Sequence, residues 1–402
     1  MLDRKFGGSS MTERTIWTKN FVLITIANGL LFVNFHCLVP TIAMYAASLG
    51  ASGSEIGIIA GIFAFSAILV RLFTDAFVQR LGKRGCLFLG LFLSLSATVS
   101  YGMFTNFHAL LLARIVHGFG FGLSTTFAAA LAVDVIPLRH RGEGLGYFGL
   151  GNTVSMGAAP AIGVAVFSNV NAVALFAMSA GAALLSLLLF RCVSGSQKEE
   201  KSSLAETARK KLPLPLKNRL YEKGTGIISL FAVLFGFVFA SVNTYLPLMA
   251  QEKGIPYSGF FFLIGTLFTF LSRLFGGKLY DRRGPFSVII PGLLIYSVFL
   301  LLLLSASSAA MLLFSSAFFG LGAGLVMPSV MTWLFNTAAP ERRSNAGATY
   351  YNMLDLGTCT GIIVLGAAAG AVGYVVIFKY VLAVMAFYLI FALWVYKRWR
   401  ER

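Results

Sequence analysis

Five ionisable side chains lie within long apolar stretches of this 402-residue sequence, and each is a candidate for chemistry: Asp75, Asp355, Arg114, His117 and His36. An ionisable group in such surroundings is costly, and by default it suggests function. Desolvation and a nearby cation act in opposite directions on the proton affinity of a carboxylate, so a change in surroundings can load or release a proton. We therefore predict that Asp355, in "YYNMLDLGTCTG", couples the protein to protons, with Asp75 as a second candidate. The alternative for Asp355 is permanent pairing with an interior partner.

The depth of these residues can be estimated from helix geometry. Asp355 lies twelve residues after Arg343, or roughly 18 Å along a helix, close to the middle of a ~30 Å hydrocarbon core. Arg114 reaches a similar depth from the other side, and it is predicted to anchor an anionic substrate, to pair with Asp355, or to serve only in packing. His117 follows Arg114 at i+3 and so shares its face. His117 and His36 are predicted to bind substrate or relay protons, unless each is only hydrogen-bonded within the helices.

Further polar positions extend this candidate site. Asp75 stands at i+4 from Arg71, a spacing that favours an ion pair on one helix, and we expect that pair to be structural or to act in gating. Seven other side chains are predicted to line a substrate cavity, with hydrogen bonding between helices as the alternative for each: Asn34, Asn152, Asn243, Tyr245, Trp333, Tyr351 and Asn352.

The elements that must position these residues are membrane helices. The chain is 57% hydrophobic and only 12% charged, whereas a soluble domain carries about 25% charged residues. Taking roughly 20 apolar residues per span, we predict an all-α membrane protein with twelve spanning segments. They run near 20–48, 54–80, 85–105, 106–136, 140–168, 171–193, 224–252, 256–282, 285–306, 307–337, 342–370 and 373–398.

The positive charge of the chain follows its topology. The formal net charge is +17, yet Lys and Arg gather in alternate short loops and in the tail that begins at Lys397. This bias predicts that both termini are cytoplasmic, in a multi-pass protein of the cell membrane. The basic surplus is thus explained by topology, and we expect no nucleic-acid partner. A polar break predicts four parts: a cytoplasmic tail (1–19), a six-helix bundle (20–193), a cytoplasmic linker (194–223) and a second six-helix bundle with a basic tail (224–402).

An internal repeat relates the two predicted bundles at an offset of 202 residues. "RLFTDAFVQRLGKR" begins at Arg71, and "RLFGGKLYDRRGPF" begins at Arg273, with Gly82 and Gly284 at the same later position. Two halves in the same orientation imply a pseudo-two-fold axis along the membrane normal, with a site between them at mid-depth. The asymmetric positions are more informative about chemistry, because what both halves share should be scaffold. Asp355 aligns with Thr153 in this register.

Several motifs resemble those of the major facilitator superfamily, and in this order they cover most of the chain. "GGKLYDRRGPF" is similar to the family's loop between helices 2 and 3, whereas the first copy has Asp75 in place of its glycine and Gln79 in place of its aspartate. "LLLARIVHGFGFG" resembles the helix 4 motif. "GLGNTVSMGAAPAIG" resembles the helix 5 motif that the family associates with antiporters, with Ala159 in place of a glycine. The resemblance implies two pseudo-symmetric bundles of six helices.

The repeated basic elements are predicted to form a cytoplasmic latch. Arginine and lysine can bind carboxylates and the exposed carbonyls at helix ends, so these residues would hold the cytoplasmic side shut in an outward-facing state. Their alternative role is to mark topology. The predicted gating residues are Arg71, Arg80, Lys83, Arg84, Asp134, Arg141, Arg273, Asp281, Arg282 and Arg343.

The predicted function is transport. The sequence shows no Walker motif, catalytic triad or metal cluster, so we expect no enzyme activity, no cofactor, and a proton gradient as the driving force. The leading hypothesis is a bacterial proton-coupled antiporter that exports a small organic molecule, a drug or metabolite that includes anionic, metal-chelating acids. The alternatives are a proton symporter or facilitator for a sugar-like or carboxylate solute, a lipid flippase, and a non-transporting membrane sensor or scaffold. We expect a monomer, because two halves build one site.

Overall fold

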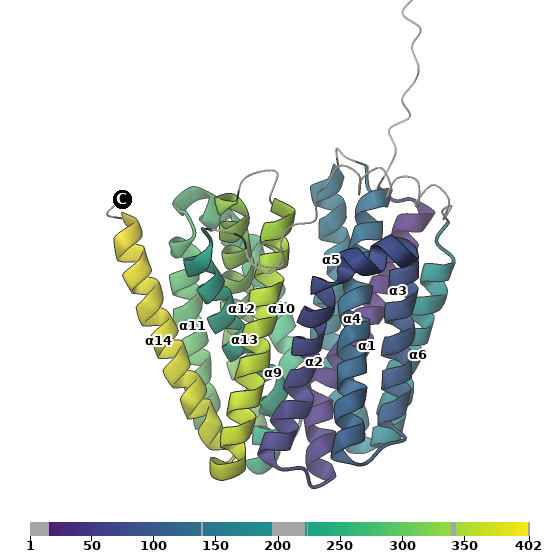
Figure 1. Ribbon diagram of the computed structural model, residues 1–402. Coiled ribbons are helices and arrows are strands. Elements are labelled where there is room, and N and C mark those ends of the chain that lie inside the picture. The colour runs from purple at the N-terminus through teal and green to yellow at the C-terminus, as the bar shows by residue number, and fades with distance from the viewer. Residues whose placement is uncertain (1–15, 138–139, 195–221, 223, 339–342, 401–402) are drawn as a thin grey trace, which may run out of the picture.

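The computed structural model describes residues 16–137, 140–194, 222, 224–338 and 343–400, which form long helices and no strand (Figure 1). The first six helices are α1 (Lys19–Ser48), α2 (Gly53–Leu72), α3 (Thr74–Tyr101), α4 (Phe107–Val135), α5 (Arg141–Asn169) and α6 (Ala172–Arg191). The second six are α9 (Gly226–Glu252), α10 (Phe260–Arg283), α11 (Phe286–Ser305), α12 (Ala309–Thr337), α13 (Arg343–Val372) and α14 (Tyr374–Arg400).

All twelve of these helices are long and apolar enough to cross a membrane. Their 20 to 30 residues correspond to about 30–45 Å, which spans a hydrocarbon core of about 30 Å. The predicted all-α fold with twelve spans is therefore confirmed. The interior of the predicted linker, residues 195–221 and 223, lies outside the described residues.

The boundary between the second and third spans was predicted wrongly. We expected one helix to continue to residue 80, but α2 ends at Leu72 and α3 begins at Thr74. The bend between the spans comes later, inside α3 at Gly82, where φ is 72° and ψ is 169°. Gly284 follows α10 with φ of 80° and ψ of 178°. This combination of angles is essentially restricted to glycine, so the repeat is visible in the backbone as well as in the sequence.

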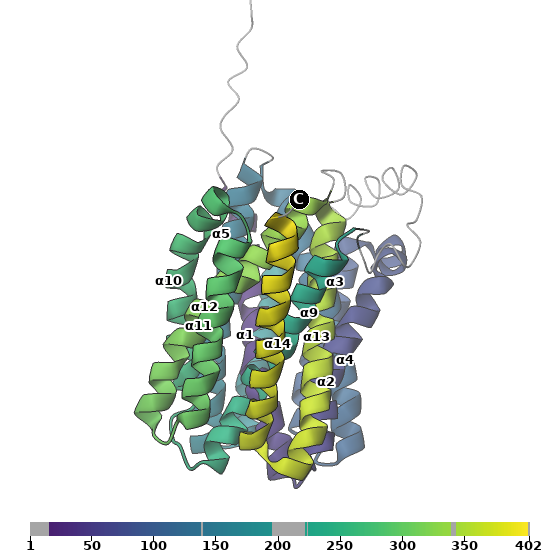
Figure 2. The same ribbon diagram turned by 90° about the vertical axis from the view of Figure 1, so that its left-hand side faces the viewer.

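The helices form two bundles, α1–α6 and α9–α14, which lie side by side (Figure 1). Helix α2 packs along α13, and α5 packs along α10 (Figure 2). Small residues permit this close approach, as is usual between membrane helices. A Cβ atom added at Gly57 would lie 3.0 Å from the Cα atom of Gly366, and one added at Gly53 would lie 2.4 Å from the backbone nitrogen of Gly370.

The two ends of the molecule are packed differently. We call the end that contains Ile16 and Arg400 the terminal end, and the opposite end, where α2 begins, the distal end. A core of buried residues runs through both bundles and includes Ile42 of α1 and Leu246 of α9. A separate core near the terminal end, which includes Leu131, consists of residues from the first bundle alone. The halves are thus joined most tightly toward the distal end, and their buried cores separate toward the terminal end.

Replacement of Gly284 by alanine should destabilise the protein, because a Cβ atom strains a backbone with positive φ. We expect a cost of about 1–3 kcal/mol, seen as a lower midpoint of thermal unfolding for the purified protein in detergent. Gly277→Ala is the matched control, since that glycine is helical and a Cβ atom added there meets nothing within 4 Å. Equal midpoints for the two variants would contradict this account of the turn.

Candidate functional site

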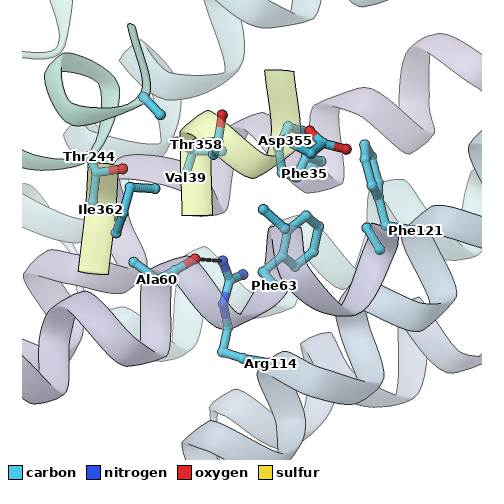
Figure 3. A pocket seen from close by; sticks show the side chains of 13 residues that line it. Phe35, Val39, Ala60, Phe63, Arg114, Phe121, Thr244, Asp355, Thr358 and Ile362 are labelled. Carbon is cyan, nitrogen blue, oxygen red and sulfur yellow. Dashed lines mark hydrogen bonds between the residues drawn. The ribbon is translucent and has the colours of Figure 1, made fainter. Parts of the chain in front are cut away.

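A small cavity of about 70 Å³ lies between the two bundles (Figure 3). Helices of the first bundle contribute the aromatic side chains Phe35, Phe63 and Phe121 together with Arg114. Helices α9 and α13 of the second bundle contribute Ala240, Thr244, Asp355, Thr358 and Ile362. We call this space the central cavity. Its wall is mainly apolar, and Arg114 and Asp355 are the residues with ionisable side chains among those that line it.

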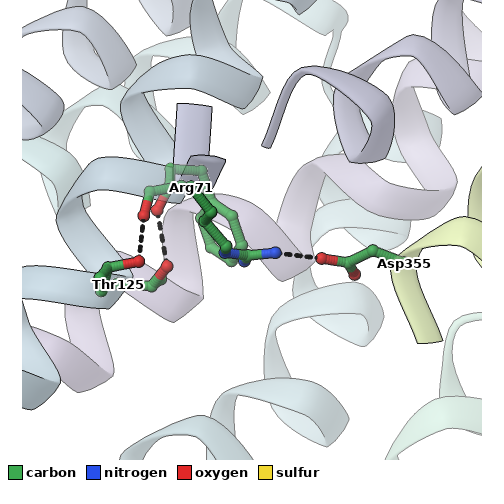
Figure 4. A network of polar contacts seen from close by, with 6 residues as sticks. Arg71, Thr125 and Asp355 are labelled. Carbon is green, nitrogen blue, oxygen red and sulfur yellow. Dashed lines mark hydrogen bonds and ion pairs between the residues drawn. The ribbon is translucent and has the colours of Figure 1, made fainter. Parts of the chain in front are cut away.

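Asp355 forms an ion pair with Arg71 that joins the two bundles. The Nη1 atom of Arg71, near the end of α2, donates to Oδ2 of Asp355 on α13 (Figure 4). The two side chains are only 20% and 25% exposed. A charge pair with so little contact to water depends strongly on both partners, because removal of one leaves the other buried and uncompensated.

The predicted pairing of Arg71 with Asp75 is corrected by this geometry. The i+4 rule assumes one continuous helix, but α2 ends at Leu72 and Asp75 lies in the first turn of α3. The side chain of Asp75 is exposed, while the guanidinium of Arg71 extends to the opposite bundle. Asp355 is therefore paired with an interior cation, and that cation comes from the other half of the chain.

Arg114 lines the central cavity but does not form the predicted pair with Asp355. It is 3% exposed, and its Nε and Nη2 atoms donate to the carbonyl oxygens of Ile59 and Ala60 at 3.1 and 3.4 Å. Its guanidinium also lies 4.5 Å from the centre of the Phe63 ring, a distance that allows a cation–π interaction. Figure 3 shows the Phe63 ring between Arg114 and Asp355.

His117 and Asn34 belong to a hydrogen-bond network inside the first bundle. Both are fully buried. The ring of His117 bonds the Tyr101 hydroxyl at 3.0 Å and the Asn34 side chain at 3.1 Å. Asn34 in turn bonds Thr98 and Ser179. The i+3 spacing predicted that Arg114 and His117 share one helix face. At His117, however, this face packs against other helices of the first bundle. His117 and Asn34 therefore do not line the central cavity.

Five other predicted cavity residues have partners elsewhere. His36 and Asn152 bond each other at 2.9 Å, which links α1 to α5. Asn243 donates to Phe239 of its own helix, and the buried Tyr245 hydroxyl donates to the carbonyl of Ile362. Trp333 packs edge-on against Phe231 and Phe286, with ring centroids 5.4 and 5.0 Å away. Hydrogen bonding between helices, the alternative to lining the cavity, describes Asn152 and Tyr245, whereas Asn243 bonds within its own helix and Trp333 makes aromatic contacts.

Tyr351 and Asn352 lie close to the cross-bundle ion pair. Tyr351 is 47% exposed, and its hydroxyl is within electrostatic range of Arg71, Asp355 and Arg273. Asn352 is 4% exposed, and its Oδ1 atom is buried without a hydrogen-bond partner. Arg273, on α10, donates from Nη1 to the hydroxyl of Thr153 on α5 at 3.3 Å.

Apart from Arg71 and Arg273, the predicted latch residues with described side chains lie at the terminal end. Lys83 pairs with Asp134 at 2.5 Å, which connects α3 to α4 within the first bundle. Arg80, Asp281 and Arg282 are exposed, and Arg84 is partly buried. The side chains of Arg141 and Arg343 lie outside the described residues. Among the described side chains, the ion pair that crosses between the bundles is the one between Arg71 and Asp355.

The sequence reading missed several residues of the cavity wall. Phe35, Phe63 and Phe121 stack on one another, with centroid distances of 4.4 to 5.3 Å. Nothing marks these three among the 38 phenylalanines of the chain. Thr358 carried a usable signal, because it stands at i+3 from Asp355 and so shares its face.

The chemistry available at this site is binding and proton exchange. Among the described residues, no group of three or more His, Cys, Asp or Glu side chains could hold a metal ion. The cavity offers one carboxylate, an arginine and aromatic faces, between two bundles that meet tightly at one end.

Comparisons with known proteins agree with this architecture. A model of the Major Facilitator Superfamily matches residues 24–361 and 267–402. The staphylopine export protein of Staphylococcus aureus (strain Mu50) is 24% identical over 340 residues, which is 81% of this chain and 83% of that protein. The quinolone resistance protein NorA of the same strain is 23% identical over 347 residues, 84% of this chain and 87% of that protein. Among solved structures, the nucleoside transporter NupG matches with a TM-score of 0.75 at 14% identity, covering 94% of this chain and 98% of that chain.

A double-mutant cycle should reveal the coupling between Arg71 and Asp355. We expect Arg71→Gln or Asp355→Asn to cost about 3 kcal/mol each, because each leaves one buried charge without its partner. The double variant should lose less than the sum, since neither charge remains. The measurement is chemical denaturation of the purified protein in detergent, with the exposed carboxylate variant Asp281→Asn as control. Additive losses would show that the two side chains are not coupled.

Proposed function

Because this chain belongs to the major facilitator superfamily of transporters, we propose that it couples proton movement to the export of a small organic molecule. The observation that carries this proposal is the position of Asp355. It lines the central cavity on one bundle and is paired with Arg71 of the other, so its protonation state acts on the contact between the halves.

The proposed cycle depends on that contact. An ionised Asp355 attracts Arg71, and a protonated Asp355 does not, so proton binding weakens one link between α2 and α13. The same two helices pack through glycines at the distal end. In the cycle we propose, the halves rock about the central cavity, which opens alternately to each side. The carboxylate takes a proton from the side where protons are abundant and releases it on the other.

The orientation proposed for the membrane places the terminal end in the cytoplasm. It follows the positive-inside rule, because the basic loops near Arg80 and Arg282 lie at the end that contains Ile16 and Arg400. In this orientation the tightly packed distal end faces outward, and the described conformation faces the cell interior. We propose the cell membrane as the location and a monomer as the working unit, since the two bundles of one chain enclose the cavity.

Export is favoured over uptake by two observations. One relative is described as an export protein and another as a quinolone resistance protein. The sequence "GAAPAIG" on α5 also resembles the motif that the family associates with antiporters. Both point to a drug or metabolite that leaves the cell in exchange for protons.

The test is a proton-flux assay in proteoliposomes that contain a pH-sensitive dye, with a quinolone and staphylopine as candidate solutes. We expect solute-dependent proton movement with the wild-type protein, at least tenfold less with Asp355→Asn, and no loss with Glu143→Gln, which changes an exposed carboxylate. Proton movement opposite to the solute identifies antiport, and movement with it identifies symport. Flux that persists unchanged in Asp355→Asn would remove Asp355 as the coupling residue.

A further inference from the structure

The internal repeat makes the ion pair at Asp355 one of two equivalent contacts. Arg71 and Arg273 are 202 residues apart, and so are Thr153 and Asp355. Each arginine reaches across to the other bundle. Arg71 of the first bundle donates to Asp355 of the second, and Arg273 of the second donates to Thr153 of the first. The two contacts are therefore mates under the pseudo-two-fold axis.

The two contacts differ in charge. Arg71 has a carboxylate as its partner, whereas the Nη1 atom of Arg273 has a hydroxyl at 3.3 Å. The Nε atom of Arg273 is buried and has no hydrogen-bond partner. No carboxylate among the described residues lies within ion-pairing distance of Arg273. Beside the neutralised pair lies a second cation that no carboxylate among the described residues compensates.

An uncompensated cation in this position is costly and calls for a ligand. Tyr351 is within electrostatic range of both arginines and of Asp355, and Tyr350 is near Arg273. The charges of Arg71 and Asp355 cancel, so Arg71, Asp355 and Arg273 together carry a net charge of one positive unit. A buried polar or charged group normally finds a partner, and an arginine fork fits a carboxylate through two parallel hydrogen bonds.

We propose that Arg273 binds the carboxylate of an organic anion, which supplies the negative charge that Asp355 supplies in the symmetric contact. The edge formed by Nε and Nη2 binds the anion, and Thr153 keeps Nη1 in position. This inference rests on the proposed transport function and names its substrate class as small organic carboxylates. It also gives Arg273, which the sequence placed among the gating residues, a role in substrate binding.

Arg114 is a weaker candidate for the same role. Its Nε and Nη2 atoms already donate to two main-chain carbonyls, and its guanidinium lies over the Phe63 ring. An anion would have to displace contacts at Arg114, whereas at Arg273 it would satisfy an atom that has no partner.

The test uses a substitution that introduces a carboxylate next to Arg273. In Thr153→Asp, the new side chain should pair with Nη1 of Arg273 and supply the negative charge that the anion otherwise brings. The probe is benzoate, compared with the neutral benzamide of similar shape, and the readout is the midpoint of thermal unfolding of the full chain in detergent. Benzoate, but not benzamide, should stabilise the wild type and Lys278→Gln, which removes an exposed charge from the same helix. Thr153→Asp should be more stable without ligand and should bind benzoate at least tenfold more weakly, as should Arg273→Gln.

The inference is overturned if benzoate has no effect on the wild type at tens of millimolar, if benzamide acts equally, or if Thr153→Asp keeps the full benzoate response. Should Arg273→Gln fail to fold, the Thr153→Asp comparison decides alone. Benzoate binding can be measured without a proton gradient. The proposal of proton coupling and the proposal of anion binding at Arg273 can therefore be tested independently. Benzoate binding without proton flux overturns the coupling mechanism, and flux without benzoate binding at Arg273 overturns this inference.

Discussion

The structure depends on one ion pair held between two halves in apolar surroundings. Asp355 and Arg71 come from opposite bundles and have little contact with water, so each is stable in its charged form chiefly because the other is there. Such a pair does more than hold two helices together. It makes the relative position of the bundles depend on whether the carboxylate is ionised, which a purely apolar contact would not do.

The same two helices carry the closest packing in the interface. Gly53 and Gly57 of α2 face Gly366 and Gly370 of α13 near the distal end, and the ion pair lies farther along these helices toward the terminal end. Close packing of small residues depends on shape and is independent of protonation, whereas the ion pair depends on charge. One end of the α2–α13 contact is therefore governed by steric fit, and the other responds to protons.

The repeat explains both the scaffold and its departure from symmetry. The positive-φ glycines, Gly82 and Gly284, are equivalent positions with nearly equal backbone angles. The cross-bundle arginines are equivalent as well, but Thr153 replaces the carboxylate in one contact. The residues that both halves share thus form the scaffold. The residues that differ give one contact a carboxylate that a proton can bind and leave the other contact with an arginine that an anion can bind.

The sequence by itself determined the fold class and the repeat, because apolar length and residue spacing are properties of the linear chain. It did not determine which residues are partners. Arg71 was assigned to Asp75 four residues away, yet its partner is 284 residues away. His117 was assigned to the cavity, yet it is bonded within one bundle. Only the packing of the helices decides where a helix ends, which way its faces point and which residues meet between the bundles. Each side chain can then find partners that lie far away in the sequence.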